Sequence, residues 1–181
     1  GRWNMTVEDW NDPEDGTYTP WYSINKTSGR SGETVEIRFT QANETGMMKN
    51  IMLNISAGTA EPVSIFIMQD PMPATKITVW DTDEAITIAN NTLLSFNAND
   101  ISSNRVEYGI DTNGSIDVAI CTAGTSNPIT EEESWLNAYY GMGSLVMSPR
   151  SANTTGADRK LDVVLKGGDV ELFRIPVVQK A

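Results

Sequence analysis

The chain has 181 residues, of which 39% are hydrophobic and 20% charged, enough for one large or two small folded domains. Its formal net charge is −11, from 24 acidic and 13 basic residues, which disfavours nucleic acid and anionic membrane surfaces as partners, because both need clustered cations. It contains no histidine, the commonest general base and metal ligand, and its one cysteine excludes an intrachain disulfide.

No apolar run approaches the ~20 residues that a membrane-spanning helix needs, and no signal-peptide pattern is present. We therefore expect no membrane insertion by this segment. The sequence begins at Gly1 without a methionine, which indicates a trimmed fragment or a mature form.

Strand patterns dominate the first third of the chain. Residues 34–39, 51–55 and 63–68 alternate apolar and polar side chains, which is typical of half-buried antiparallel strands. Turn chemistry at 43–46 and a hairpin-like loop at 57–62 connect them. The opening strand signals before residue 34 are weak, so we expect this module to lack the first strands of a full sandwich.

A short proline-containing segment follows. Residues 72–75 (Met-Pro-Ala-Thr) come directly after Gln-Asp-Pro and form the best linker, which should join its neighbours stiffly. The sequence therefore predicts two modules, 1–72 and 73–181.

The second module begins with additional strands, at 86–96 and 105–121. Residues 111–115 (Asp-Thr-Asn-Gly-Ser) predict a two-residue hairpin between strands 106–110 and 116–120. The only helix candidate is 130–139. Inward rows are expected at 161–165 and 173–177, and Pro176 predicts that the last strand lies at an edge or a bulge.

The end of each module is a copy of the same passage. Residues 35–69 align with 145–179 at a constant offset of 110 without gaps, with eight of 35 positions identical. The identical residues are Ala42/Ala152, Asn43/Asn153, Thr45/Thr155, Gly46/Gly156, Gly58/Gly168, Glu61/Glu171, Ile65/Ile175 and Gln69/Gln179. Two copies of one β module, with short strands and frequent turns, predict an all-β fold of two tandem antiparallel sandwiches.

The repeat carries a recognisable motif: an aromatic turn, a glycine, Asn-x-Thr-Gly, a basic residue, and a strand that ends in glutamine. In the first copy these residues are Trp21-Tyr22-Ser23-Ile24, Gly29, Asn43-Glu44-Thr45-Gly46, Lys49 and Gln69. In the second they are Trp135-Leu136, Gly141, Asn153-Thr154-Thr155-Gly156, Arg159 and Val177-Val178-Gln179. The pattern resembles the BACON domain, an immunoglobulin-like β-sandwich common in Bacteroidetes, in two tandem copies of which the first is incomplete.

The resemblance covers 21–69 well and 77–181 in outline, with departures in both copies. The first copy ends in Ile67-Met68-Gln69 where the family has V-x-Q, and its opening strands are weak or absent. Lys49 stands where the family usually has arginine, and the segment from Trp135 to Ala138 lacks the second β-branched residue of the aromatic turn. The resemblance implies a secreted or periplasmic protein, or an outer-membrane lipoprotein at the cell surface, associated with carbohydrate-active proteins. It implies a carbohydrate-binding or spacer role toward polysaccharide or mucin glycans, and supplies no catalytic residues.

Candidate binding residues are aromatic, because aromatic rings stack on the apolar faces of sugars while their polar edges stay hydrated. Those in loop-like stretches are Trp10, Tyr18, Tyr22, Tyr139 and Tyr140. Ordinary loop packing is the alternative for these five. Trp21 and Trp135 are expected to fill the two cores at matched positions.

The sequence gives less support to metal binding, to thiol chemistry and to glycosylation. The acidic residues that could bind Ca²⁺ are Asp12, Glu14, Asp15, Asp81, Asp83 and Glu84. They lack the spacing of a calcium-binding loop, so solvated acidic loops are favoured and no metal is expected. Cys121 lies at a buried strand position and is predicted to be an inert thiol. The seven Asn-x-Ser/Thr sequons are attributed to turns and surface polarity.

The sequence contains no phosphate loop, zinc spacing or nucleophile elbow, and no carboxylate pair stands out. We expect no enzyme and no cofactor. The alternative function is a structural or adhesin-type accessory protein whose exposed strand edges engage a partner surface protein.

Overall fold

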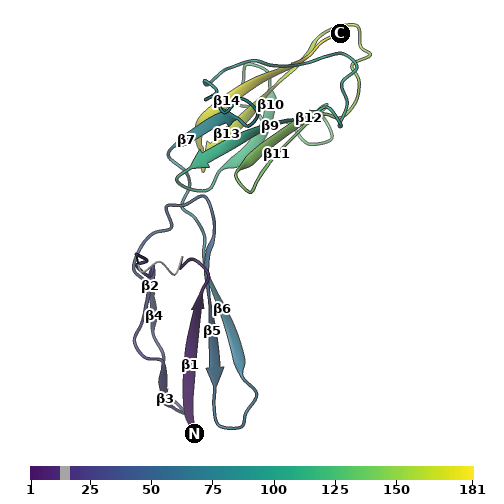
Figure 1. The fold of residues 1–181 in the computed structure, drawn as a ribbon. Coiled ribbons are helices and arrows are strands. Elements are labelled where there is room, and N and C mark those ends of the chain that lie inside the picture. The colour runs from purple at the N-terminus through teal and green to yellow at the C-terminus, as the bar shows by residue number, and fades with distance from the viewer. Residues whose placement is uncertain (13–16) are drawn as a thin grey trace. The chain divides into compact units, whose positions relative to one another are not determined.

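The computed structural model describes residues 1–12 and 17–181. They form two compact units, Gly1–Met72 (unit 1) and Pro73–Ala181 (unit 2). Both are built of strands and turns, and the described ranges contain no helix that could cross a membrane (Figure 1). The predicted all-β class is confirmed.

Unit 2 is a complete two-sheet sandwich. Its strands are β7 (Ile77–Asp81), β8 (Leu94–Phe96), β9 (Val106–Thr112), β10 (Asp117–Thr122), β11 (Leu136–Gly141), β12 (Ser144–Pro149), β13 (Arg159–Gly167) and β14 (Val170–Gln179). One sheet has the order β11-β12-β9-β7 and the other β10-β13-β14-β8. All pairs are antiparallel except β8 with β14. This arrangement matches the two-sheet, Greek-key organisation of the immunoglobulin fold.

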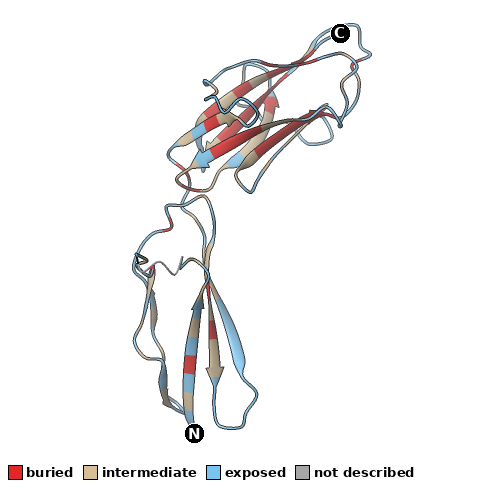
Figure 2. Ribbon diagram, in the orientation of Figure 1, coloured by how far each residue is buried: buried red, intermediate tan, exposed pale blue. Residues whose placement is uncertain are grey.

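The core of unit 2 lies between these sheets. Alternate residues of β13 and β14 point inward, so Val163 and Ile175 are fully buried and face partners on β9 and β12 such as Ile110 and Met147. Figure 2 shows buried segments, in red, on several strands of this unit. The inward rows predicted at 161–165 and 173–177 are confirmed.

Unit 1 repeats part of this arrangement. Its strands are β1 (Arg2–Asp9), β2 (Tyr22–Ile24), β3 (Ser28–Arg30), β4 (Ile37–Phe39), β5 (Lys49–Ser56) and β6 (Val63–Gln69). In the sheet β3-β1-β5-β6, strands β1, β5 and β6 correspond to β10, β13 and β14 of unit 2. In the sheet β2-β4, the two strands correspond to β11 and β12. Among described residues 1–12 and 17–72, no strand corresponds to β7, β8 or β9. The small core consists of Met5, Trp21, Ile51 and Leu53, with partly buried neighbours.

The sequence repeat is a structural repeat of one hairpin. Leu53 pairs with Ile65 on β5 and β6, and Val163 pairs with Ile175 on β13 and β14, at the same offset of 110. The two hairpins therefore share their register as well as their sequence pattern.

The hairpin predicted at 111–115 is wrong. β9 pairs with β7 and β12, whereas β10 pairs with β13, so this segment crosses from one sheet to the other. The Asn113 side-chain oxygen accepts hydrogen bonds from the backbone N–H groups of Thr75 and Lys76 at 3.0 and 2.9 Å. The asparagine thus stabilises the crossing by binding the chain just before β7.

Two further expectations are corrected. Pro176 does not mark an edge, because β14 lies between β13 and β8; the pairing with β8 begins at Val177, directly after the residue that lacks an N–H. Residues 130–139 form a turn followed by the start of β11 rather than a helix. The turn is closed by Glu133, whose carboxylate accepts hydrogen bonds from the backbone N–H and hydroxyl of Thr130, both at 2.9 Å.

Candidate functional site

The five candidate aromatic residues are divided between the two units. In unit 1, Tyr18 donates a hydrogen bond to the Asp9 carboxylate at 2.7 Å, and Tyr22 packs against Trp21 with ring centroids 5.3 Å apart. Both tyrosines are partly buried against the core, and desolvation, with Asp9 adding to it, raises their pKa values. These two rings are held by internal contacts.

Trp10 is the most open of the unit 1 candidates, at 56% exposed, and its ring centroid lies 6.0 Å from that of Phe66 on β6. The buried Trp21 confirms its predicted place in the core. Trp135 packs against the core of unit 2 as predicted but is only partly buried, and the Arg159 guanidinium lies 5.2 Å from its ring centroid. The two matched tryptophans therefore occupy different environments.

In unit 2, Tyr139 and Tyr140 are consecutive residues of β11 and point to opposite faces. Tyr140 packs against the core, whereas Tyr139 is 58% exposed. Tyr139 borders a groove of about 550 Å³ where β10 and β11 approach each other. The groove is lined by Val118, Ala119, Ile120, Pro128, Ile129, Thr130, Glu131, Asn137, Ala138, Tyr139, Ser148 and Arg150.

Both apolar and polar side chains line this groove. Arg150 donates a hydrogen bond to the Glu131 carboxylate at 2.9 Å, and Asn137 adds an amide. One exposed ring beside paired donors and acceptors is a chemically suitable setting for a hydroxylated ligand. Tyr139 was named from the sequence as a candidate, whereas Asn137 and Arg150 were not, because nothing local in the sequence shows that residues of β10, β11 and the end of β12 line one groove.

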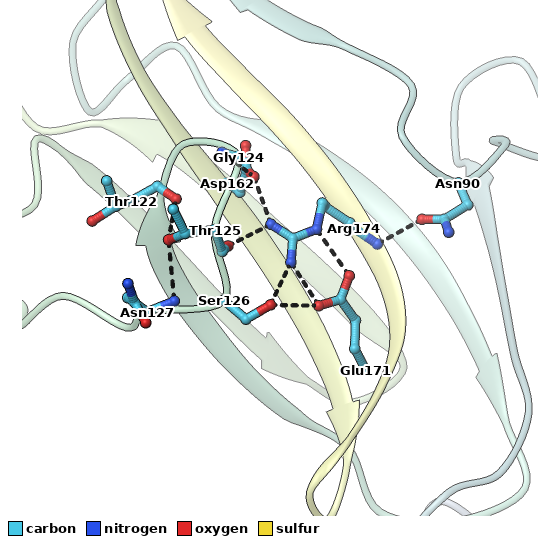
Figure 3. Close-up of polar contacts among 9 residues, drawn as sticks. All are labelled: Asn90, Thr122, Gly124, Thr125, Ser126, Asn127, Asp162, Glu171 and Arg174. Carbon is cyan, nitrogen blue, oxygen red and sulfur yellow. Dashed lines mark hydrogen bonds and ion pairs between the residues drawn. The ribbon is translucent and has the colours of Figure 1, made fainter.

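A second polar cluster surrounds Arg174 on β14 (Figure 3). Its Nη1 donates to Asp162 and to the Thr125 carbonyl, both at 2.6 Å, while Nη2 and Nε bind both oxygens of Glu171 at 2.6 and 2.8 Å. Nη2 also donates to the Ser126 hydroxyl at 2.9 Å. The hydrogen bond to Glu171 raises the pKa of Arg174 and lowers that of Glu171.

All three guanidinium nitrogens are thus engaged within the protein. Asp162, which is almost completely buried, also accepts the Gly124 N–H at 2.9 Å. The cluster fastens the turn after β10 to β13 and β14, and we assign it a structural role.

The Asn-x-Thr-Gly turns form the same hydrogen-bonded closure in both units. Asn153 donates to the carbonyls of Ala157 and Gln179 at 2.8 and 3.2 Å, and Thr155 donates to the Asn153 side chain at 2.7 Å. Asn43 makes the equivalent bonds in unit 1, at 2.8 Å to the Met47 carbonyl and 3.0 Å to that of Gln69. Both asparagines are buried, which supports turn chemistry as the role of these two sequons.

Within the described ranges, no group of three or more His, Cys, Asp or Glu residues could hold a metal ion. Asp81 instead closes a turn by accepting the backbone N–H groups of Asp83 and Glu84 at 2.9 and 3.0 Å. Glu14 and Asp15 of the acidic set lie outside the described residues. Cys121 is fully buried as predicted, and burial raises the pKa of its thiol.

No protein-family model and no curated protein matches the chain. A mutated variant of a titin fragment of three immunoglobulin domains is 11% identical with a TM-score of 0.34, covering 98% of this chain and 54% of that one. An endo-fucoidan hydrolase of glycoside hydrolase family 107 is 10% identical with a TM-score of 0.35, covering 97% of this chain and 23% of that one. Domains 5–6 of the S-layer protein SbsC are 16% identical with a TM-score of 0.31, covering 98% of this chain and 80% of that one. The chain spans about half the length of the titin fragment.

Proposed function

We propose that the chain is a non-catalytic protein of tandem BACON-type modules, secreted, periplasmic or attached to the cell surface of a Bacteroidetes-type bacterium. Several of the residues that carry the resemblance in unit 2 support this, because they bind one another. Arg159 binds the side chain of Gln179 at 2.7 Å and the Ser151 carbonyl at 2.6 Å, beside the Asn153 turn. A motif whose residues interlock in this way is a folding signature of a module, not a set of reactive groups.

For unit 2 we propose a carbohydrate-binding role, and the groove beside Tyr139 is the observation that carries it. A pyranose ring has an apolar face that can lie against the exposed tyrosine, and hydroxyls that can bond to Glu131, Asn137 and Arg150. The groove is open rather than deep, which suits one stretch of a polysaccharide or a mucin glycan. If it binds no glycan, the module serves as a spacer.

A glycan array with the intact chain tests this role. We expect saturable binding that weakens about tenfold or more in Tyr139→Ala. Phe66→Ala is the matched control, because Phe66 is as exposed as Tyr139 but lies in the other unit and does not line the groove. Equal loss in both variants, or no binding to plant, mucin or microbial glycans, contradicts carbohydrate binding in the groove.

The absence of catalysis has its own test. Incubation with the bound polysaccharide should release no reducing ends between about pH 4 and pH 9, a range that includes the raised pKa values of catalytic carboxylic acids. Time-dependent release by the intact chain would refute the non-catalytic assignment.

A second role, engagement of a partner protein through an exposed strand edge, is favoured by one observation. β6 lies at the end of its sheet in unit 1, whereas its counterpart β14 in unit 2 is covered by β8.

A further inference from the structure

Unit 2 has a second groove, of about 430 Å³, on the outer face of the sheet β10-β13-β14-β8. Leu161 and Val177 pack into the core, so their neighbours Lys160, Pro176 and Val178 point to the opposite face, where they line this groove. The groove described above shares no lining residue with it. The two grooves are therefore separate sites of one unit.

Two segments outside the sheet form the walls of the second groove, and hydrogen bonds hold both in place. On one side is the turn after β10, where the Gly124 N–H donates to the buried Asp162 carboxylate at 2.9 Å. On the other side the Asn91 N–H donates to the Arg174 carbonyl at 2.9 Å. Figure 3 shows Arg174 between this turn and Asn90, whose side-chain oxygen accepts the Arg174 N–H at 2.8 Å. A ligand would therefore enter a groove whose walls are already ordered.

The lining between these walls is mainly apolar and aliphatic. Leu93 lies on one wall and is 59% exposed, while Pro176 and Val178 of β14 contribute the floor. Aliphatic side chains gain most by removing a hydrocarbon chain from water, whereas a sugar ring gains from stacking on an aromatic ring. This lining therefore suits a hydrocarbon chain.

The charges at one end of the groove have the opposite sign to the chain as a whole. Lys160 and Lys180 lie with Asp158 where β13 begins and β14 ends, in a chain with a net charge of −11. Lys180 is paired with Asp158 at 3.1 Å, but Lys160 makes no ion pair within residues 1–12 and 17–181. The other two charged residues of the lining, Asp162 and Arg174, bind each other. One ammonium group is thus available to a negatively charged ligand.

The internal repeat shows that the hairpin itself does not need these lysines. At the positions of Lys160 and Lys180, unit 1 has Asn50 and Asp70. The hairpin of β5 and β6 nevertheless has the same register as that of β13 and β14. The positive charges are therefore a feature of unit 2 that the shared fold does not require.

We propose that this groove binds a free carboxylic acid with an aliphatic chain, of the medium-chain fatty acid class. The chain lies along Leu93, Pro176 and Val178, and the carboxylate binds the Lys160 ammonium group. A free acid is favoured over a lipid within a bilayer, because a net charge of −11 opposes approach to an anionic membrane. The inference does not depend on carbohydrate binding in the other groove.

The probe is sodium octanoate, titrated below its micelle-forming concentration into the intact isotope-labelled chain and followed by NMR. Amide shifts should saturate at Leu93, Gly124, Lys160 and Val178, with a Kd of about 1 mM or lower. Hexanoate and butyrate should bind more weakly, by about two- to fourfold for each methylene removed, because less apolar surface is buried.

Lys160→Gln should weaken octanoate binding about two- to fivefold, as expected for one exposed charge pair. It should leave the binding of octanol unchanged, because octanol has the chain without the charge. Lys166→Gln is the matched control: it removes the same charge from the same strand, but Lys166 does not line the groove, so both probes should bind as they do to the wild type. Leu93→Ser should weaken both probes about threefold or more, and the fold should be retained because Leu93 is exposed.

The inference is overturned if the shifts do not saturate, if they map to the groove beside Tyr139, or if Lys160→Gln and Lys166→Gln have the same effect. Equal affinities for butyrate and octanoate would also overturn it, because the aliphatic chain would then contribute nothing. Binding to phosphatidylglycerol vesicles but not to octanoate would assign the groove to a membrane lipid instead of a free acid. Each of these outcomes leaves the test of glycan binding at Tyr139 unaffected.

Discussion

Replacing Ile175 and Ile65 by alanine, one at a time, measures how differently the two units are completed. The substitution removes three carbons, worth ~0.8 kcal/mol each when fully buried, or ~2.4 kcal/mol in all. At the fully buried Ile175 a cavity adds to this, so the loss should fall within about 2–5 kcal/mol. At Ile65, which is 44% exposed, just over half of the transfer term applies, ~1.3 kcal/mol, and no closed cavity forms.

Native-state hydrogen exchange followed by mass spectrometry is the appropriate assay, because it reports the opening free energy of each unit separately in the intact chain. Peptides from β13 and β14 should report the larger loss in Ile175→Ala, and peptides from β5 and β6 the smaller loss in Ile65→Ala. Equal losses at the two sites, or a larger loss at Ile65, would refute the conclusion that unit 1 lacks the covering strands present in unit 2.

Three further predictions concern unit 2. Asn153→Ala should lower its free energy of unfolding by about 1–3 kcal/mol in urea titration, because buried carbonyls lose their donors; a loss below ~0.5 kcal/mol would contradict the turn's structural role. The hydrogen bond from Arg174 lowers the pKa of Glu171 in the folded state. The contact therefore stabilises the folded protein fully above the ordinary glutamate pKa of about 4.3, and this stabilisation is lost as the pH falls through the lower pKa of the folded state. The stability difference between the wild type and Glu171→Gln should therefore shrink as the pH falls from 7 to about 3, and a constant difference would exclude the contact. Cys121 should react with a thiol reagent only when unit 2 opens, and rapid labelling of the native protein would show that the thiol is not buried.

The hairpins at the end of each unit were predictable because their information is local. In β5, β6, β13 and β14, apolar and polar side chains alternate with a period of two. The repeat aligns the two hairpins, which have the same register in the structure. β1 was missed, although Trp3, Met5 and Val7 alternate in the same way. Its pattern has no obvious copy elsewhere in the sequence, so the repeat did not point to it.

Sheet membership was not predictable, because it depends on contacts between distant segments. Asn113 has the neighbours of a hairpin turn, but the strands on either side pair with β12 and β13 instead of each other. Pro176 was misplaced for the same reason, since the strand that covers β14 comes from 83 residues earlier in the chain, as the pairing of Ser95 with Val178 shows. The groove beside Tyr139 arises from a similar long-range approach of β10 to β11.

Amide hydrogen exchange measured residue by residue by NMR tests the central claim most directly, because each backbone N–H reports whether it has a strand neighbour. Along β6 we predict alternation, with the amides facing β5 protected and those facing outward exchanging rapidly. At Val178 and its neighbours on β14, which pair on both sides, we predict protection without alternation. Uniform protection along β6 in the isolated monomeric chain would show that its edge is already covered and would contradict the account.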